Sequence, residues 1–178
     1  MNRVLLCSFV LTVGCGSGSS GNAPPGVPSE YSFLYNGGIG SSDVAATWAG
    51  LPYDSIELER TGCLGTCPAY KVTLRKGGSS TYEGVAFAER QGAWLGDIDI
   101  WAYGRLCYLI DELRFRELSP SYEASWTDAE TVRLTVVPSG RATPLTVSEY
   151  GGIGPARLWA LQLAVEATAE GVKWTKAQ

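Results

Sequence analysis

The chain has 178 residues, of which 45% are hydrophobic, and its 18 acidic and 14 basic residues give a net charge of −4. This is the length and composition of a single globular domain. The sequence contains no basic patch, so nucleic acid is not expected as a partner. The sequence contains no histidine, which excludes Ser-His-Asp and Cys-His nucleophile pairs and His-ligated zinc, and leaves carboxylate, thiol, tyrosine and lysine chemistry.

The N-terminus has the features of an export signal. A single positive charge precedes a short apolar run over residues 4–13, which is too short for a permanent membrane helix. The run ends at Gly14-Cys15, which resembles a bacterial lipoprotein signal with Cys15 as the lipidated residue. We interpret residues 1–14 as a signal peptide; the alternative is ordinary secretory cleavage near Gly14. Either interpretation places the mature domain outside the cytoplasm. Lipidation would anchor it to a membrane of the cell envelope, facing the periplasm or in the outer membrane.

Residues 15–52 are rich in glycine, serine, proline and asparagine, and we interpret them as a flexible tether. Several large apolar residues are too hydrophobic for a pure linker: Tyr31, Phe33, Leu34, Tyr35 and Trp48. We therefore expect part of residues 30–50 to pack on the domain, which we place at residues 53–178.

The first half of this domain predicts three strands. Residues 55–60 and 70–75 alternate between apolar and polar side chains, as strands with one buried face do. Residues 76–79 form a glycine-containing turn, and residues 81–87 return as a third strand. Glu57 and Glu59 fall on one face of the first strand, where a solvated surface is a simpler interpretation than a glycosidase-type acid pair.

The second half repeats this order. A helix follows the first strands, capped by Asp97 or Asp99. Strands are then predicted over residues 131–137 and 143–149, and a second helix opens at Pro155. The apolar stripes of the two helices are Ala102, Leu106, Leu109, Ile110 and Leu113 in the first and Leu158, Leu161, Val165 and Ala169 in the second. We predict an α+β fold in which two hairpin-plus-helix units form an antiparallel sheet with both helices on one face.

A cysteine loop lies between the first two predicted strands. Cys63 and Cys67 are separated by Leu64-Gly65-Thr66, and Gly65 allows the close approach that a disulfide needs. Because the compartment is oxidising, we expect a structural disulfide that holds the shape of the loop and the position of Tyr70.

Two other uses of these thiols stay open. A redox pair would need a lowered thiol pKa, and Arg60 is the only cation close in sequence. A zinc site would need Cys63 and Cys67 together with Cys107 and a carboxylate, whereas structural sites usually have four Cys or His ligands. Cys107 fits a small core residue better. We therefore expect no metal and no cofactor.

The motif Cys-x-Gly-x-Cys-Pro-x-Tyr at residues 63–70, preceded by Ile56-Glu57-Leu58-Glu59-Arg60-Thr61 and followed by Thr81-Tyr82-Glu83-Gly84, resembles the bacterial domain of unknown function numbered 6438. The resemblance covers residues 54 to about 170. It includes Tyr122, Thr127-Asp128, Tyr150-Gly151 and Gly154-Pro155 as further matching pieces. It implies a shared fold, in a family whose members are often secreted or lipid-anchored, and no known activity. The residues that it offers as motif or binding candidates are Arg60, Gly65, Pro68, Tyr70, Asp128 and Tyr150.

From these observations we expect a non-catalytic binding or scaffolding domain with a disulfide-pinned loop, and we assign no catalytic residue. Its partners would be the membrane, through the lipid, and an envelope protein or a glycan, which exposed tryptophans could stack against. The alternative function is an extracytoplasmic thiol redox protein that uses Cys63 and Cys67. The sequence carries no indication of oligomeric state.

Overall fold

The structure is a computed structural model that describes residues 23–37, 39, 43–141 and 143–178. The signal peptide, residues 1–14, and the lipidation residue Cys15 lie outside these residues, so both stay predictions, as does the division into leader, tether and domain. Within the described part of the chain, no helix is long and apolar enough to cross a membrane.

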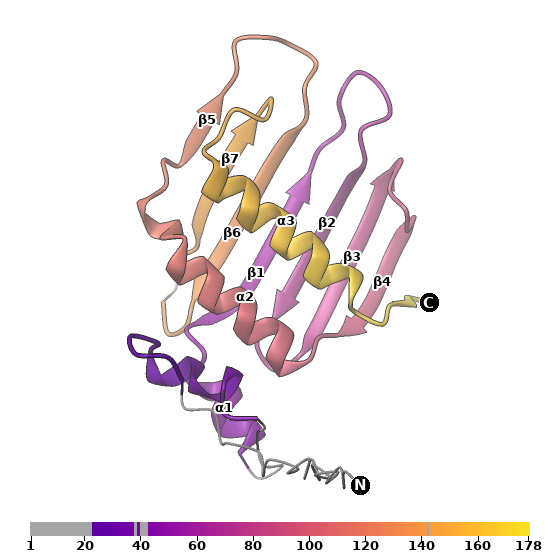
Figure 1. Cartoon of the computed structure of the whole chain (residues 1–178). Coiled ribbons are helices and arrows are strands. Elements are labelled where there is room, and N and C mark those ends of the chain that lie inside the picture. The colour runs from indigo at the N-terminus through magenta and orange to yellow at the C-terminus, as the bar shows by residue number, and fades with distance from the viewer. Residues whose placement is uncertain (1–22, 38, 40–42, 142) are drawn as a thin grey trace, which may run out of the picture.

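A single eight-stranded sheet forms the centre of the molecule, in the order β5-β7-β6-β1-β2-β3-β4-β8 (Figure 1). Every neighbouring pair is antiparallel except β5 and β7, which are parallel. The strands are β1 (Tyr53–Arg60), β2 (Ala69–Arg75), β3 (Ser79–Ala86), β4 (Gly92–Asp97), β5 (Ser121–Glu123), β6 (Thr131–Pro138), β7 (Leu145–Tyr150) and β8 (Thr175–Lys176). The helices are η1 (Ser29–Leu34), α1 (Val44–Gly50), α2 (Ile100–Glu112), η2 (Phe115–Glu117) and α3 (Ala156–Glu170).

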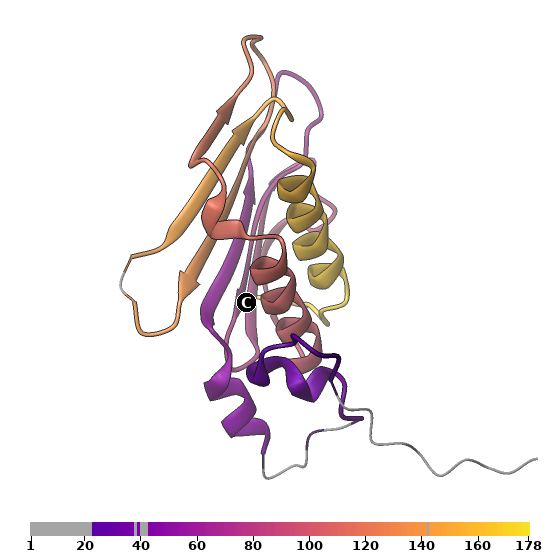
Figure 2. The same cartoon turned by 60° about the vertical axis from the view of Figure 1, so that its left-hand side comes forward.

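The two long helices, α2 and α3, lie on the same face of the sheet (Figures 1 and 2). Strand alternation directs one apolar row of each central strand towards them, and these residues form the core with the helix stripes. The core side chains of the central strands are Ile56, Leu58, Val72, Leu74, Val132, Leu134 and Val136. The opposite face is polar. There Lys71 lies 3.6 Å from Glu57 and 3.8 Å from Glu59, which agrees with a solvated face for both glutamates.

The helix starts follow local capping rules. Of the two predicted caps for α2, Asp99 is the one used: its Oδ1 accepts hydrogen bonds from the backbone N–H groups of Trp101 and Ala102, both at 2.9 Å. Pro155 stands one residue earlier than predicted, as the cap rather than the first residue of α3. The predicted stripe of α3 is buried throughout.

The segment before the sheet contributes to the core. Tyr31, on η1, is 0% exposed, and its hydroxyl donates a hydrogen bond to Asp111 of α2. Tyr53 donates to the second oxygen of the same carboxylate. Phe33 contacts α2 at Gly104, where a Cβ atom would lie 2.4 Å from the ring. Residues 29–34 therefore contact α2 through both a partly buried hydrogen bond and an aromatic ring.

The α+β class is confirmed, but the arrangement is less regular than two equal hairpin-plus-helix units. Four strands precede α2, and β5 precedes the β6–β7 hairpin as a parallel neighbour of β7. The strands β4, β5 and β8 and the short helices were not predicted.

Candidate functional site

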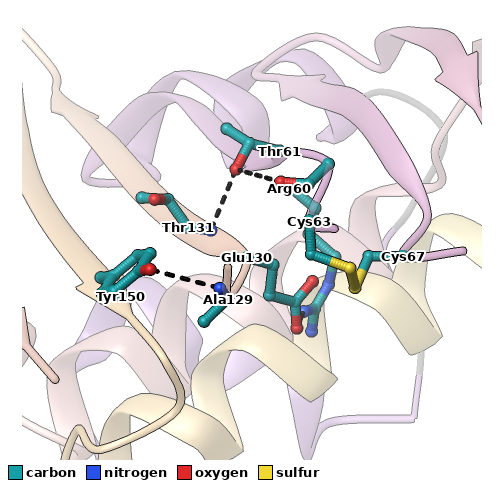
Figure 3. Close-up of a disulfide and its surroundings, with 9 residues drawn as sticks. Arg60, Thr61, Cys63, Cys67, Ala129, Glu130, Thr131 and Tyr150 are labelled. Atoms are coloured by element: carbon teal, nitrogen blue, oxygen red, sulfur yellow. Dashed lines mark hydrogen bonds and ion pairs between the residues drawn. A yellow bond between two sulfur atoms is a disulfide. The ribbon is translucent and has the colours of Figure 1, made fainter. Parts of the chain in front are cut away.

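The disulfide loop joins β1 to β2. Cys63 and Cys67 are bonded, with their Cα atoms 5.5 Å apart (Figure 3). Gly65, at the tip, has φ +151°, a conformation that side chains rarely adopt. Leu64 beside it is 83% exposed. The predicted disulfide is therefore present, and it closes a short loop that projects into solvent.

A second loop, residues 124–130 between β5 and β6, lies against the disulfide loop. The backbone N–H of Thr61 donates to the carbonyl of Thr131 at 3.0 Å, and Thr131 N–H donates to Thr61 Oγ1 at 2.9 Å (Figure 3). Leu64 N–H donates to the carbonyl of Asp128 at 3.4 Å. Asp128 has φ +68° and is exposed, so it contributes to this contact through its backbone.

Tyr150, at the end of β7, supports that second loop. Its hydroxyl accepts a hydrogen bond from Ala129 N–H at 3.2 Å (Figure 3). Its carbonyl accepts one from Ala124 N–H at 3.1 Å. The candidates Asp128 and Tyr150 thus shape the loop that backs the disulfide loop.

A partly buried polar cluster joins the end of β1, next to the disulfide loop, to α3. Arg60 Nε lies 2.6 Å from Glu166 Oε1, and its Nη1 lies 2.8 Å from Glu130 Oε1. Tyr70, which pairs with Arg60 across β1 and β2, donates its hydroxyl proton to the same oxygen of Glu166. Burial and this hydrogen bond raise the pKa of the Tyr70 hydroxyl above its usual range, so it stays a neutral donor. Arg60 is engaged by two carboxylates, which leaves it poorly placed to acidify a thiol.

Sequence reasoning found Arg60 and Tyr70 but missed Glu130 and Glu166. The two glutamates lie 70 and 106 residues after Arg60 in the chain. Neither belongs to a motif, because ion pairing across a fold leaves no local pattern in the sequence.

A cleft of about 280 Å³ opens between the last turns of α3 and strands β2 and β3, with Pro68 and Tyr70 of the motif in its wall. Its aromatic side is a row of rings: Tyr70 stacks on Tyr82 with centroids 5.4 Å apart, and Tyr82 lies 5.8 Å from Trp174. The charged residues in its lining are Glu89, Arg90, Glu166 and Glu170.

Gly84 allows this cleft to form. A Cβ atom at Gly84 would lie 1.7 Å from the backbone oxygen of Arg90, so only glycine lets the chain after β3 fold back onto the strand. The side-chain amide of Gln91 donates to the carbonyl of Ala88 at 2.8 Å and closes the same turn. Glu89 and Arg90 reach the cleft because of this turn.

The third described cysteine lies elsewhere. Cys107 is a free thiol buried in α2, and burial raises its pKa well above the usual value. Cys63 and Cys67 are bonded to each other, so the three do not form a ligand set. Among the described residues, no group of three His, Cys, Asp or Glu side chains is placed to hold a metal ion.

The fold and the site define an α+β protein with both long helices on one face of the sheet. Its aromatic cleft lies next to a loop that is closed by a disulfide. The model of the domain of unknown function DUF6438 matches residues 54–169, and the chain belongs to this family. The matched range runs from β1 to the penultimate residue of α3. It contains the disulfide loop and the polar cluster, whereas Trp174 and η1 lie outside it. No curated protein and no solved structure matches the chain.

Proposed function

We propose that this domain is a non-catalytic binding module of the cell envelope, anchored by a lipid on Cys15, and that the cleft beside the disulfide loop holds its ligand. The observation that carries the proposal is the row of Tyr70, Tyr82 and Trp174 along a concave surface next to the disulfide loop. Concave sites with aromatic walls and a few polar groups are the usual form of a ligand site.

The cleft wall is held in place before any ligand arrives. Tyr70 is fixed by its hydrogen bond to Glu166, by stacking on Tyr82, and by the disulfide at Cys67, three residues before it. A preorganised wall lowers the entropy lost on binding. Glu166, the most enclosed carboxylate of the lining, is already committed to Arg60 and Tyr70, which favours a structural and binding role over proton transfer.

The test is a titration followed by two-dimensional amide and indole NMR, with n-butylammonium, cellobiose, and capped lysine, arginine, norleucine and glutamate as probes. We expect at least one probe to shift the signals of Tyr82 and the indole N–H of Trp174 in a saturable way. Trp174→Ala should weaken that binding at least tenfold, because it removes one wall of the cleft.

Trp126→Ala is the matched control, since Trp126 is 54% exposed on the β5–β6 loop and outside the cleft lining. The proposal fails if no probe shifts the cleft signals, or if both tryptophan variants weaken binding equally.

The anchor has its own test. Mass spectrometry of the mature protein from the envelope should find a diacylated or triacylated cysteine at position 15 as the first residue, and Cys15→Ser should abolish it. A mature N-terminus without lipid would leave the binding proposal standing and remove the anchor.

A thiol redox protein is the second candidate, favoured by the partial exposure of Cys63 and Cys67. In that function the bridge would accept two electrons and two protons from a dithiol donor and become two thiols. Against it, Arg60 is occupied by Glu166 and Glu130, so the nearby guanidinium that would lower a thiol pKa is already paired.

Cys67→Ser separates the two candidates. If the disulfide is structural, its loss should lower the free energy of unfolding by about 2 kcal/mol, because the unfolded chain gains the entropy of the opened loop. No reductase activity should then be present in either the wild type or the variant. A variant that kept full stability and lost reductase activity would establish the redox function instead. A redox titration with thiol counting on the wild type provides the control, with Cys107 expected to stay reduced and inaccessible.

A further inference from the structure

We infer that the group bound in the cleft is a cation: an ammonium or guanidinium group, carried by a basic peptide side chain or by a small amine. This inference rests on the proposed binding function and names the chemistry of the ligand. Four observations carry it: the charge around the cleft, the end of α3 that faces it, the row of aromatic rings, and its size.

The charge around the cleft is negative. Glu89, Glu166 and Glu170 line it together with one cation, Arg90. Behind the wall, Arg60 is shared between Glu166 and Glu130. The four carboxylates and two guanidinium groups of this region therefore carry a net charge of −2. Arg90 Nη2 lies 3.4 Å from Glu89 Oε1, so the charge of Arg90 is partly neutralised by Glu89. Glu170 forms no ion pair within 4 Å among the described residues.

The cleft also receives the C-terminal end of α3. Glu170 is the last residue of this helix and Glu166 lies one turn before it, and the last turn contains no basic residue. The C-terminus of a helix carries partial negative charge, so acidic residues there cost stability while basic ones would add to it. Two glutamates at this end therefore concentrate negative potential at the cleft, in opposition to what helix stability alone would favour.

The aromatic rings complement the carboxylates. Ring faces attract cations through their quadrupole, most strongly for tryptophan, and the attraction grows when the cation is partly removed from water. Trp174 and Tyr82 meet at an interplanar angle of 57°, and Tyr70 continues the row. A cation on this row would lie beside Glu170, so that both kinds of attraction act on one group.

The size of the cleft limits what enters it. About 280 Å³ is at the small end of ligand sites, enough for one side chain or a small amine. A basic side chain also has an aliphatic stem, which can lie against Ala88 and Ala169 of the lining.

The experiment compares charged and neutral probes of one shape. Dissociation constants are measured by NMR for N-acetyl-lysine methylamide, its arginine counterpart, and N-acetyl-norleucine methylamide, which has the lysine stem without the charge. We expect lysine or arginine to bind at least tenfold more tightly than norleucine, and binding to weaken as ionic strength rises. n-Butylammonium serves as the small amine: binding equal to that of capped lysine would identify the amine alone as the ligand, and weaker binding would identify a peptide.

Glu170→Gln should weaken lysine binding at least fivefold. Glu112→Gln is the matched control, because Glu112 is the exposed last residue of α2 and its variant removes the same charge from the same position of the other helix. Both variants must keep the dispersed spectrum of the wild type, which an exposed substitution at a helix end should allow.

Equal binding of lysine and norleucine, or equal effects of the two glutamine variants, would overturn the cationic inference while leaving the binding cleft in place. Binding of cellobiose or capped glutamate, but not of lysine or arginine, would do the same. Absence of binding by every probe would overturn the proposed function itself.

Discussion

Glu149 illustrates how a single residue can organise an element. It is 2% exposed, and it is the one buried acidic side chain among the described residues. Its Oε1 accepts hydrogen bonds from Gly154 N–H and from the indole of Trp159 at 2.7 Å, and its Oε2 accepts one from the amide of Gln162 at 2.8 Å. The carboxylate thus joins the end of β7 to the first turns of α3, where helix polarity favours a negative charge.

Replacing this carboxylate should be costly. Glu149→Ala would leave three buried or half-buried donors without their acceptor, so we expect the free energy of unfolding to fall by about 3 kcal/mol or more. Urea denaturation measures it. Glu83→Ala, an exposed glutamate on β3, is the control and should change stability by less than about 0.5 kcal/mol. A loss at Glu149 no larger than the loss at Glu83 would mean that these hydrogen bonds are replaced by water.

At the scale of elements, the contact of η1 with α2 depends on Gly104 in the middle of the helix. Glycine there costs helix propensity, and alanine would ordinarily stabilise the helix by about 1 kcal/mol. The ring of Phe33 occupies the space that a Cβ would need. The glycine that lowers the helix propensity of α2 at this position is therefore also what allows Phe33 of η1 to pack there.

A double-mutant cycle tests this contact. Gly104→Ala alone should destabilise the protein by about 1–3 kcal/mol through overpacking. In a Phe33→Ala background the same change should become neutral or stabilising, because the space is then free. Thermal and urea unfolding of the four proteins give the coupling energy. Simple additivity of the two changes would show that η1 does not pack on α2 in solution.

Elements with a clear pattern were predictable and those set by tertiary contact were not. The alternation of β1, β2, β3, β6 and β7, the cap Asp99 and the stripe of α3 are local signals, and each corresponds to the structure. In contrast, β4 has glycine at two of its six positions, and Gly96 is needed because a Cβ there would lie 2.5 Å from Val172. The two-residue β8 and three-residue β5 are too short to carry a pattern. The duplication of a hairpin-plus-helix unit stays a prediction.

The candidate site divides in the same way. The disulfide and the motif residues Pro68 and Tyr70 could be found from the sequence because they form one short segment. The cleft could not, since it brings together residues from β2, β3, the turn after β3, α3 and the segment after it. Glu166 and Glu170 lie outside the predicted apolar stripe of α3, and only the position of α3 beside β2 and β3 places them at a cleft.

At the scale of the whole molecule, buried tyrosines couple stability to alkaline pH. Burial raises the pKa of Tyr31, Tyr53 and Tyr103, and for the first two the hydrogen bond to Asp111 raises it further. In the unfolded chain these hydroxyls titrate near pH 10. Above that pH the unfolded chain has released protons that the folded chain still holds, so stability that is complete below pH 10 is lost as pH rises.

We therefore expect the free energy of unfolding to fall above about pH 9 by about 1.4 kcal/mol per pH unit for each of these tyrosines. The buried Cys107 thiol, whose pKa is also raised, adds a similar decline that begins at about pH 8.5. Urea denaturation at pH 8, 9, 10 and 11 measures the slope. Tyr31→Phe should be less stable at pH 8, having lost its bond to Asp111, but should show a shallower decline above pH 10. A wild-type stability that stays constant to pH 11 would contradict the buried, neutral state of these side chains.

The two end strands of the sheet have a consequence for how the molecule meets its neighbours. β8 covers only Trp94 and Leu95 of β4, and β5 covers only the last three residues of β7, so each end of the sheet is closed by a strand of two or three residues. Leu95, on the β4 side, is 55% exposed. Short end strands offer few free N–H and C=O groups to an incoming chain, and they protect a sheet from strand-by-strand aggregation. The strand after Trp174 thus covers part of the edge of β4, and its removal would expose those N–H and C=O groups to pairing with a strand of another molecule.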